Sequence, residues 1–135
     1  MLGAADFDLG RGLAKGLSRG LFHKDRVNSE MVDAYVRPFL GVAGRLAYLR
    51  AARALRTEEL ATRMDAVERL DIPTLIVWGA EDVFQPLDCG ARLAAAMPHA
   101  RFEVIEQAGH FLPEDEPERL AGLIGNFVRS RNPVD

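Results

Sequence analysis

The sequence "PTLIVWGAEDVFQP", residues 73–86, decides the fold of this chain. It opens with a short, continuous apolar run that ends at Gly79, as is typical of a strand buried on both faces of a sheet. The next residues, "PLDCGARLAAAMP" (86–98), predict a helix that Pro98 closes, and "RFEVIE" (101–106) predicts a second strand. Because the connections are short, we expect two parallel strands in a right-handed βαβ unit of an α/β fold.

A last helix follows in "EPERLAGLIGNFVRS" (116–130), with Pro117 near its first turn and an apolar stripe along one side. The acidic run "EDEPE" (114–118) is interpreted as a capping run, because negative charge is favourable at the start of a helix. Residues 71–135 therefore predict a βαβα unit.

The residues before this unit predict helices. "VNSEMVDAYV" (27–36) offers Asn28 or Ser29 as an N-cap, and Pro38 should end or kink the helix. Two more helices are expected, one over residues 41–55 and one that Thr57 can cap, with Leu60, Met64 and Val67 as its apolar stripe. We expect residues 1–70 to form a separate helical segment.

Two polar side chains follow the two predicted strands, at the point where each strand ends. Asp82 comes after the first strand and His110 after the second. Neighbouring parallel strands lie about 4.8 Å apart, so loops at the same edge can bring a carboxylate to an imidazole. A carboxylate that accepts the imidazole N–H fixes its tautomer and makes the histidine a general base. A turn aspartate and a loop histidine are each common, but their paired placement favours a functional pair.

These residues resemble the last two strands and the last helix of the α/β-hydrolase fold. The resemblance covers residues 70 to 130, where a strand, Gly-x-x-Asp, a helix, a strand, Gly-His and a helix follow one another in the order of that family. It implies that Asp82 is the catalytic acid and that His110 is the catalytic histidine. It also implies that residues 1–70 correspond to the helical cap that such enzymes insert before these strands.

A G-x-S-x-G spelling at residues 16–20 raises the question of the nucleophile. Ser18, Asp82 and His110 would follow the family's order of nucleophile, acid and histidine. A nucleophile elbow, however, needs a buried strand that runs into it, and the glycine-rich residues before Ser18 predict none. We therefore expect Ser18 not to be the nucleophile. The chain is expected to hold the acid and the base of a hydrolase without its nucleophile and oxyanion hole.

Two classes of function remain open. In the first, the chain is the C-terminal portion of an α/β hydrolase that acts on an ester-like or related small substrate. Its nucleophile is a serine or, as in the epoxide-hydrolase and haloalkane-dehalogenase branches, an aspartate. In the second, it is a non-catalytic fragment that assembles through an exposed sheet edge at "TLIVW" (74–78). Both classes lead us to expect a homo-oligomer or an N-terminal partner chain that completes the sheet.

Composition bears on the expected binding partners, cellular location and cofactors of the protein. Apolar residues make up 48% of the chain and charged residues 27%, as in globular proteins, and the net charge of −3 gives no reason to expect nucleic-acid or membrane binding. The first residues lack the pattern of a signal peptide, and the lone Cys89 suits a reducing compartment. We expect a cytoplasmic protein. The scattered histidines predict no metal site, and no motif indicates a cofactor.

Overall fold

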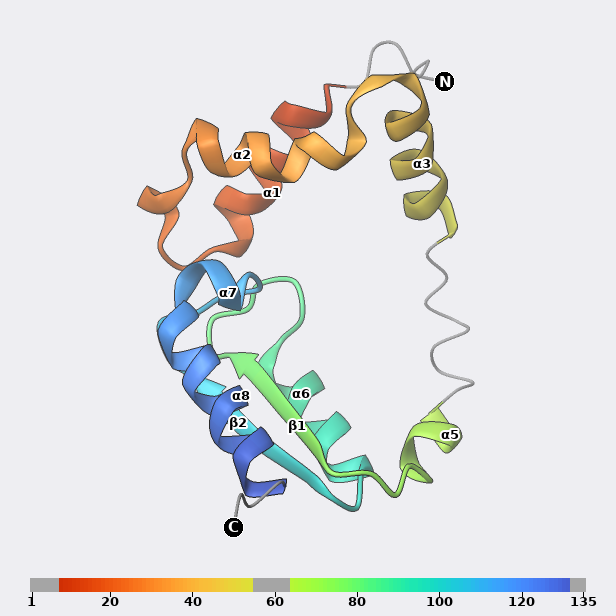
Figure 1. Cartoon of the computed structure of the whole chain (residues 1–135), viewed down its shortest axis with the longest axis vertical. Helices are drawn as coiled ribbons and strands as arrows, with labels where there is room; N and C mark the ends of the chain where they lie inside the picture. The colour runs from red at the N-terminus through yellow and green to blue at the C-terminus, as the bar shows by residue number, and fades with distance from the viewer. Residues whose placement is uncertain (1–7, 55–63, 132–135) are drawn as a thin grey trace. The chain divides into compact units, whose positions relative to one another are not determined.

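The computed structural model describes residues 8–54 and 64–131 of the chain, and Figure 1 shows its helices and strands. The chain divides into two compact units. The first comprises Met1–Arg19 and Lys24–Thr62, and the second comprises Gly20–His23 and Arg63–Asp135. The role of the helical segment as a cap stays a prediction.

The described part of the first unit is helical. Its elements are α1 (Leu9–Gly20, whose last residue belongs to the second unit), the 3₁₀ turns η1 (Lys24–Arg26) and η2 (Arg37–Phe39), and the helices α2 (Ser29–Val36) and α3 (Gly41–Ala54). Asn28 is the N-cap of α2, since its side-chain oxygen accepts the Met31 N–H at 2.9 Å. The helix ends before Pro38, as expected.

Helix α1 lies within the segment expected to be helical, although no individual helix was predicted over these glycine-rich residues. The Asp8 carboxylate accepts the Arg11 N–H at 2.9 Å and caps the start of the helix. Leu9 and Leu17 recur at helical spacing and are buried. Capping and burial of this stripe outweigh the cost of glycine in the helix interior. Thr57 and Leu60 of the third expected helix lie outside the described residues, while Met64 begins the short helix α5 (Met64–Glu68).

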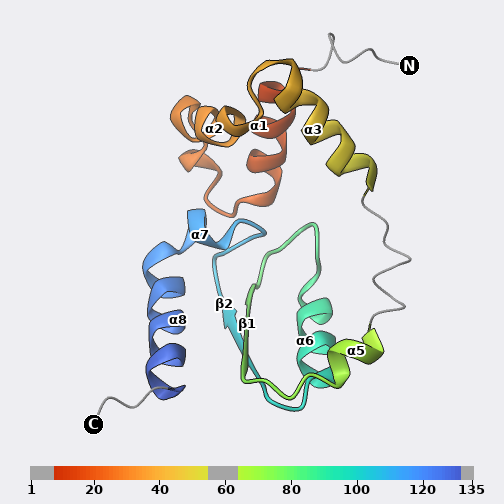
Figure 2. The same ribbon diagram turned by 45° about the vertical axis from the view of Figure 1, so that its right-hand side comes forward.

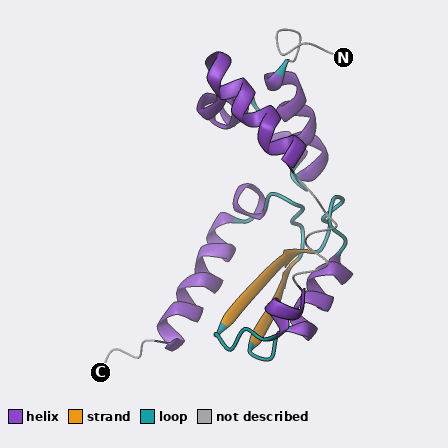
Figure 3. Ribbon diagram, turned by 90° about the vertical axis from the view of Figure 1, so that its right-hand side faces the viewer, coloured by secondary structure: helices purple, strands orange, loops and turns teal. Residues whose placement is uncertain are grey.

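The second unit contains the predicted βαβα order. Strand β1 (Thr74–Gly79) leads through α6 (Leu87–Ala96) to β2 (Ala100–Ile105), and α8 (Pro117–Arg131) ends the described chain. The strands are parallel, in a register that pairs Thr74 with Ala100 and Gly79 with Ile105. Helices α6 and α8 lie on opposite faces of this sheet (Figures 2 and 3). A single-turn helix that the sequence did not predict, α7 (Leu112–Asp115), precedes α8.

Close packing fixes the two strands against α6. Ile76 and Ile105 are buried in the sheet, and Ala108, just beyond β2, is fully buried. Gly90 lets α6 approach β1, because a Cβ atom there would come within 2.6 Å of the Trp78 ring. None of the helices in the described ranges is both long enough and apolar enough to cross a membrane.

Candidate active site

The two loops that follow the strands are joined by main-chain hydrogen bonds. The Ala80 N–H donates to the Ile105 carbonyl at 3.0 Å, and the Glu81 N–H donates to the Ala108 carbonyl at 3.0 Å. A second hydrogen bond joins the same two residues, because the Glu81 side chain accepts the Ala108 N–H at 3.1 Å. Gly79 allows this approach, since a Cβ atom there would overlap the carbonyl oxygens of the second loop. The loops at the carboxyl ends of β1 and β2 are therefore fixed relative to each other.

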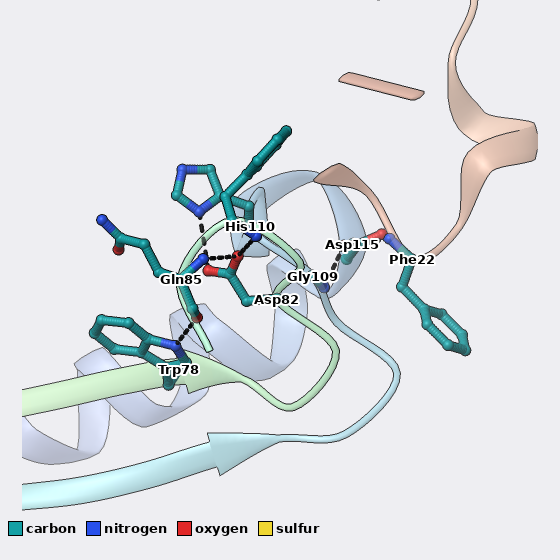
Figure 4. Close-up of polar contacts among 8 residues, drawn as sticks. Phe22, Trp78, Asp82, Gln85, Gly109, His110 and Asp115 are labelled. Atoms are coloured by element: carbon teal, nitrogen blue, oxygen red, sulfur yellow. Dashed lines mark hydrogen bonds and ion pairs between the residues drawn. The ribbon is translucent and has the colours of Figure 1, made fainter. Parts of the chain in front are cut away.

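Asp82 is held in place by its own loop. Its Oδ1 atom accepts the N–H groups of Phe84 at 2.8 Å and Gln85 at 2.9 Å, which is the hydrogen-bonding pattern of an Asx turn. The Trp78 indole N–H, at the end of β1, donates to the Gln85 carbonyl at 2.9 Å and ties the turn to the strand (Figure 4). Because Oδ1 is used within the loop, Oδ2 is left for a partner outside it.

That partner is His110. Its Nδ1 atom lies 2.9 Å from Asp82 Oδ2, so the expected proximity of the two side chains is confirmed (Figure 4). The Asp82 side chain is 6% exposed and the His110 side chain is 34% exposed, so the imidazole stays open to solvent while the carboxylate is covered. Burial raises the pKa of Asp82, but hydrogen bonds from the Gln85 N–H, from His110 and from the Phe84 N–H lower it, and the pKa as a whole is lowered from its ordinary value of 3.8.

The ionised carboxylate decides which imidazole nitrogen carries the hydrogen. A carboxylate can only accept hydrogen bonds, so the neutral imidazole must donate from Nδ1 to Asp82. Its Nε2 atom then carries a lone pair that can accept a proton from a nucleophile or from water. The two phenyl rings of Phe84 and Phe111 meet the imidazole edge to face, with centroids 5.2 and 5.3 Å away, and restrict its rotation.

The backbone of His110 is fixed as firmly as its side chain. The His110 N–H donates to the Gly20 carbonyl at 2.8 Å. Gly109 must be glycine there, because a Cβ atom would overlap the same carbonyl oxygen. Gln107, in the turn after β2, has a left-handed φ of 61°, which is uncommon for a residue with a side chain.

The interpretation of "EDEPE" as a capping run is wrong for Asp115. This residue ends α7 rather than starting α8, and its side chain is 1% exposed. It accepts the N–H groups of Gly109 at 2.8 Å, His23 at 2.9 Å and Phe22 at 3.0 Å. No local pattern could have revealed this role, because two of the three donors lie more than ninety residues earlier in the chain. Glu118 does lie in the first turn of α8, as expected.

Ser18 does not occupy a nucleophile elbow. It lies within α1 and is exposed, with helix rather than strand before it. The G-x-S-x-G spelling is therefore part of a glycine-containing helix. Within residues 8–54 and 64–131, no group of three or more His, Cys, Asp and Glu side chains could hold a metal ion.

A small cavity of about 130 Å³ opens beside the pair, lined by Asp82, His110 and the end of β1. A larger depression of about 550 Å³ lies at the opposite end of the strands, beside Pro73 and Ala100. Despite its larger volume, this depression is not the candidate active site, because it is remote from the Asp82–His110 pair and open to solvent. The smaller cavity is therefore the candidate site.

A sequence model of the alpha/beta hydrolase family matches residues 2–123, which is most of the chain. This chain belongs to the alpha/beta hydrolase family. The observed two-stranded parallel sheet and its helices are thus part of the α/β-hydrolase fold, which confirms the fold predicted from the sequence.

Individual relatives agree with this assignment. An uncharacterized hydrolase of Bacillus subtilis, YugF, is 30% identical to this chain over 118 residues. The matched residues cover 87% of this chain and 42% of the relative. A 2-hydroxy-6-oxononadienedioate/2-hydroxy-6-oxononatrienedioate hydrolase of Pseudomonas is 37% identical over 59 residues, covering 44% of this chain and 21% of the relative.

A solved structure extends the likeness to nearly the whole chain. The meta-cleavage product hydrolase of Pseudomonas fluorescens IP01 superposes with a TM-score of 0.76 over 96% of this chain and 48% of its own, at 16% identity. At that identity the likeness shows the fold alone. The chain spans less than half the length of each of these three relatives.

Proposed function

We propose that Asp82 and His110 are the acid and the general base of a hydrolase active site. The observation that carries this proposal is the 2.9 Å contact between Asp82 Oδ2 and His110 Nδ1 at the carboxyl ends of two parallel strands. Asp82 orients the imidazole and stabilises its charged form, and Nε2 takes the proton of the attacking group. Residues 1–70 would form the cap of this hydrolase.

The nucleophile and the oxyanion hole would come from outside these 135 residues, either from a longer form of the chain or from a partner chain. The helical position of Ser18 supports this proposal, as does the coverage of less than half of each relative. A serine nucleophile would be activated by His110, whereas an aspartate nucleophile would leave His110 to activate water. Both mechanisms use the same Asp82–His110 pair.

The substrate would be a small molecule with an ester or a related carbonyl group. The name of the Pseudomonas relative describes a substrate with an oxo group, and its matched segment is 37% identical to this chain. Nucleophilic attack on a carbonyl carbon, assisted by a histidine base, accounts for hydrolysis of esters and of such oxo compounds alike.

Kinetics of the assembled hydrolase would test the roles of the pair. Asp82→Asn keeps the size of the side chain but replaces an acceptor with a donor, so the imidazole would adopt the other tautomer. We expect kcat to fall by a factor of about ten thousand. Asp88→Asn, which removes an exposed carboxylate in α6, is the matched control and should leave kcat unchanged. Equal activity of the two variants would contradict the proposal.

A second assay, on the 135-residue chain alone, would test the exclusion of Ser18. We expect little or no hydrolysis of p-nitrophenyl acetate by the wild-type chain or by its Ser18→Ala and His110→Ala variants, because a histidine base without a positioned nucleophile forgoes covalent catalysis. Rapid turnover that disappears in both variants would instead make Ser18 the nucleophile.

A second candidate function is assembly through the sheet. In the described residues β1 pairs with β2 and with no other strand, so one side of β1 carries unpaired backbone groups. Two large aliphatic side chains of the neighbouring helix α8, Ile124 and Val128, are 48% and 52% exposed. A further strand from a second copy or from a partner chain would pair with this edge and cover part of that apolar surface.

A further inference from the structure

Asp115 is the buried charged residue of the described chain, and it is absent from the acid–base chemistry above. Its side chain is 1% exposed. An ionised carboxylate is costly to bury unless hydrogen bonds replace its water, so a buried carboxylate is kept where those bonds do something that water cannot. The partners of Asp115 therefore indicate what it is for.

Its carboxylate accepts three main-chain N–H groups, which belong to two segments of the second unit. Oδ2 accepts the Gly109 N–H at 2.8 Å and the Phe22 N–H at 3.0 Å, and Oδ1 accepts the His23 N–H at 2.9 Å. Figure 4 shows the carboxylate between Gly109 and Phe22. Hydrogen bonds to a charged acceptor are about twice as strong as neutral ones, so one side chain joins the two segments firmly.

The same two segments meet again at His110. The His110 N–H donates to the Gly20 carbonyl at 2.8 Å, so the segment that Asp115 holds through Phe22 and His23 also holds the backbone of the histidine. Asp115, Phe22, Gly20, His110 and Gly109 thus form a closed ring of hydrogen bonds and chain. The Glu116 carboxylate also lies 3.5 Å from the imidazole of His23, in the segment that Asp115 binds.

Tight packing around Gly20 and Asp115 restricts the movement of this ring of residues. A Cβ atom on Gly20 would come within 2.6 Å of Phe111 and 2.7 Å of Phe84, the two rings that flank the His110 imidazole. Helix α7 holds Asp115 itself, because the Asp115 N–H donates to the Phe111 carbonyl at 3.1 Å. A shift of the carboxylate would therefore be transmitted to both sides of His110.

We propose that Asp115 is a positioning residue for His110, which it holds in register with Asp82 by binding Gly109 on one side and the Gly20–His23 segment on the other. This inference rests on the proposed role of His110 as the base. Asp115 takes no part in the Asp82–His110 hydrogen bond and does not line the cavity beside it, so we place its effect in the two backbone segments that it binds.

Nuclear magnetic resonance on the 135-residue chain would test the proposal without any need for turnover. Asp115→Asn is isosteric but replaces one acceptor oxygen with an NH₂ group, which cannot receive an N–H. We expect amide exchange of Phe22, His23 and Gly109 to accelerate about tenfold or more, as loss of a hydrogen bond to a charged group implies. The pKa of the Asp82 carboxyl should also rise toward its value in His110→Ala, because the imidazole no longer stays in place.

Asp88→Asn is the matched control, since it removes an exposed carboxylate elsewhere in the same unit and should change neither readout. A folded Asp115→Asn protein that keeps the wild-type Asp82 pKa would overturn the proposal. The Asp82 readout separates positioning from general stability, because a residue that only stabilises the fold would not move it. If the Asp82 pKa rises in Asp115→Asn but Asp82→Asn leaves the kcat of the hydrolase unchanged, only the proposed function would be overturned.

If Asp115→Asn does not fold, exchange in the wild-type chain still decides the matter. The ring predicts that the amides of Phe22, His23, Gly109 and His110 open together, with the same dependence on denaturant. Independent opening of the His110 amide, more than about tenfold faster than that of Gly109, would contradict positioning by Asp115.

Discussion

At the scale of single residues, the two oxygens of Asp82 have separate tasks. Oδ1 accepts two N–H groups of its own turn, and Oδ2 meets Nδ1 of His110 at 2.9 Å. The first set of bonds fixes the carboxylate, and the second fixes the imidazole. Because all three favour the ionised form, they oppose the effect of burial and hold the pKa of Asp82 below 3.8.

The lowered pKa of Asp82 predicts how stability depends on pH. A carboxyl whose pKa is lower in the folded state contributes stability above its unfolded value of 3.8, and this contribution is lost as pH falls through the folded pKa. We expect Asp82→Asn to be less stable than wild type at pH 7 and the difference to shrink below about pH 4. Urea unfolding across this range is the measurement. A difference that stays constant down to the lowest pH would show that Asp82 is not stabilised as an anion.

The left-handed backbone of Gln107 gives a second residue-scale prediction. Its φ is 61°, a region that costs a non-glycine residue about 1–2 kcal/mol. Gln107→Gly should therefore leave the free energy of unfolding unchanged or raise it by up to about 1 kcal/mol, since relief of strain offsets the added flexibility of the unfolded chain. Gln85→Gly, at a loop position without positive φ, is the control and should lower stability. Equal losses in both variants would contradict strain at Gln107.

At the scale of elements, two helix glycines differ in whether a neighbouring residue leaves room for a side chain. Gly90 in α6 faces the Trp78 ring at a distance that leaves no room for a methyl group. Gly122 in α8 has open space around it. The first sets how closely α6 packs on β1, and the second is a helix-interior glycine without a packing role.

Alanine at these two positions should have opposite effects. We expect Gly122→Ala to raise the free energy of unfolding by about 0.5–1 kcal/mol, because alanine restricts the unfolded chain and fits the helix. Gly90→Ala should lower it by about 1–3 kcal/mol, since the methyl group forces the helix away from the strand. Each variant is the other's control in chemical denaturation. A stabilising Gly90→Ala would mean that α6 is free to move off the sheet.

The sequence predicts those elements that local patterns determine. Strand β1 follows from an apolar run between Pro73 and Gly79, and the site pair follows from its placement after the two strands. Residues 1–70 were expected to be helical, but the bounds of α1 could not be predicted because its glycines lower helix propensity, while burial of its leucines is a tertiary effect. Asp115 was misread because its partners Phe22 and His23 are distant in the chain, so no local pattern reports their contact.

At the scale of the whole molecule, the edge of β1 that pairs with no strand in the described residues and the exposed apolar residues of α8 lead to a prediction about assembly. We expect the chain to associate at micromolar concentration, because unpaired strand edges beside apolar surface are templates for pairing. Val128→Lys should weaken this association, since Val128 is 52% exposed on α8. Ser130→Lys adds the same charge at an exposed polar position and is the control. Sedimentation velocity of the three proteins is the measurement, and a monodisperse wild-type monomer would contradict the expectation.

The central claim is that Asp82 sets the tautomer of His110 and so leaves Nε2 to act as the base. Long-range ¹H–¹⁵N correlation of the imidazole rings, at about pH 9, where free histidine is neutral, reads the tautomer directly. We expect His110 to carry its hydrogen on Nδ1 in the wild-type chain and to revert to Nε2 in Asp82→Ala, while His99 is the same in both. A wild-type His110 with its hydrogen on Nε2 would contradict the account.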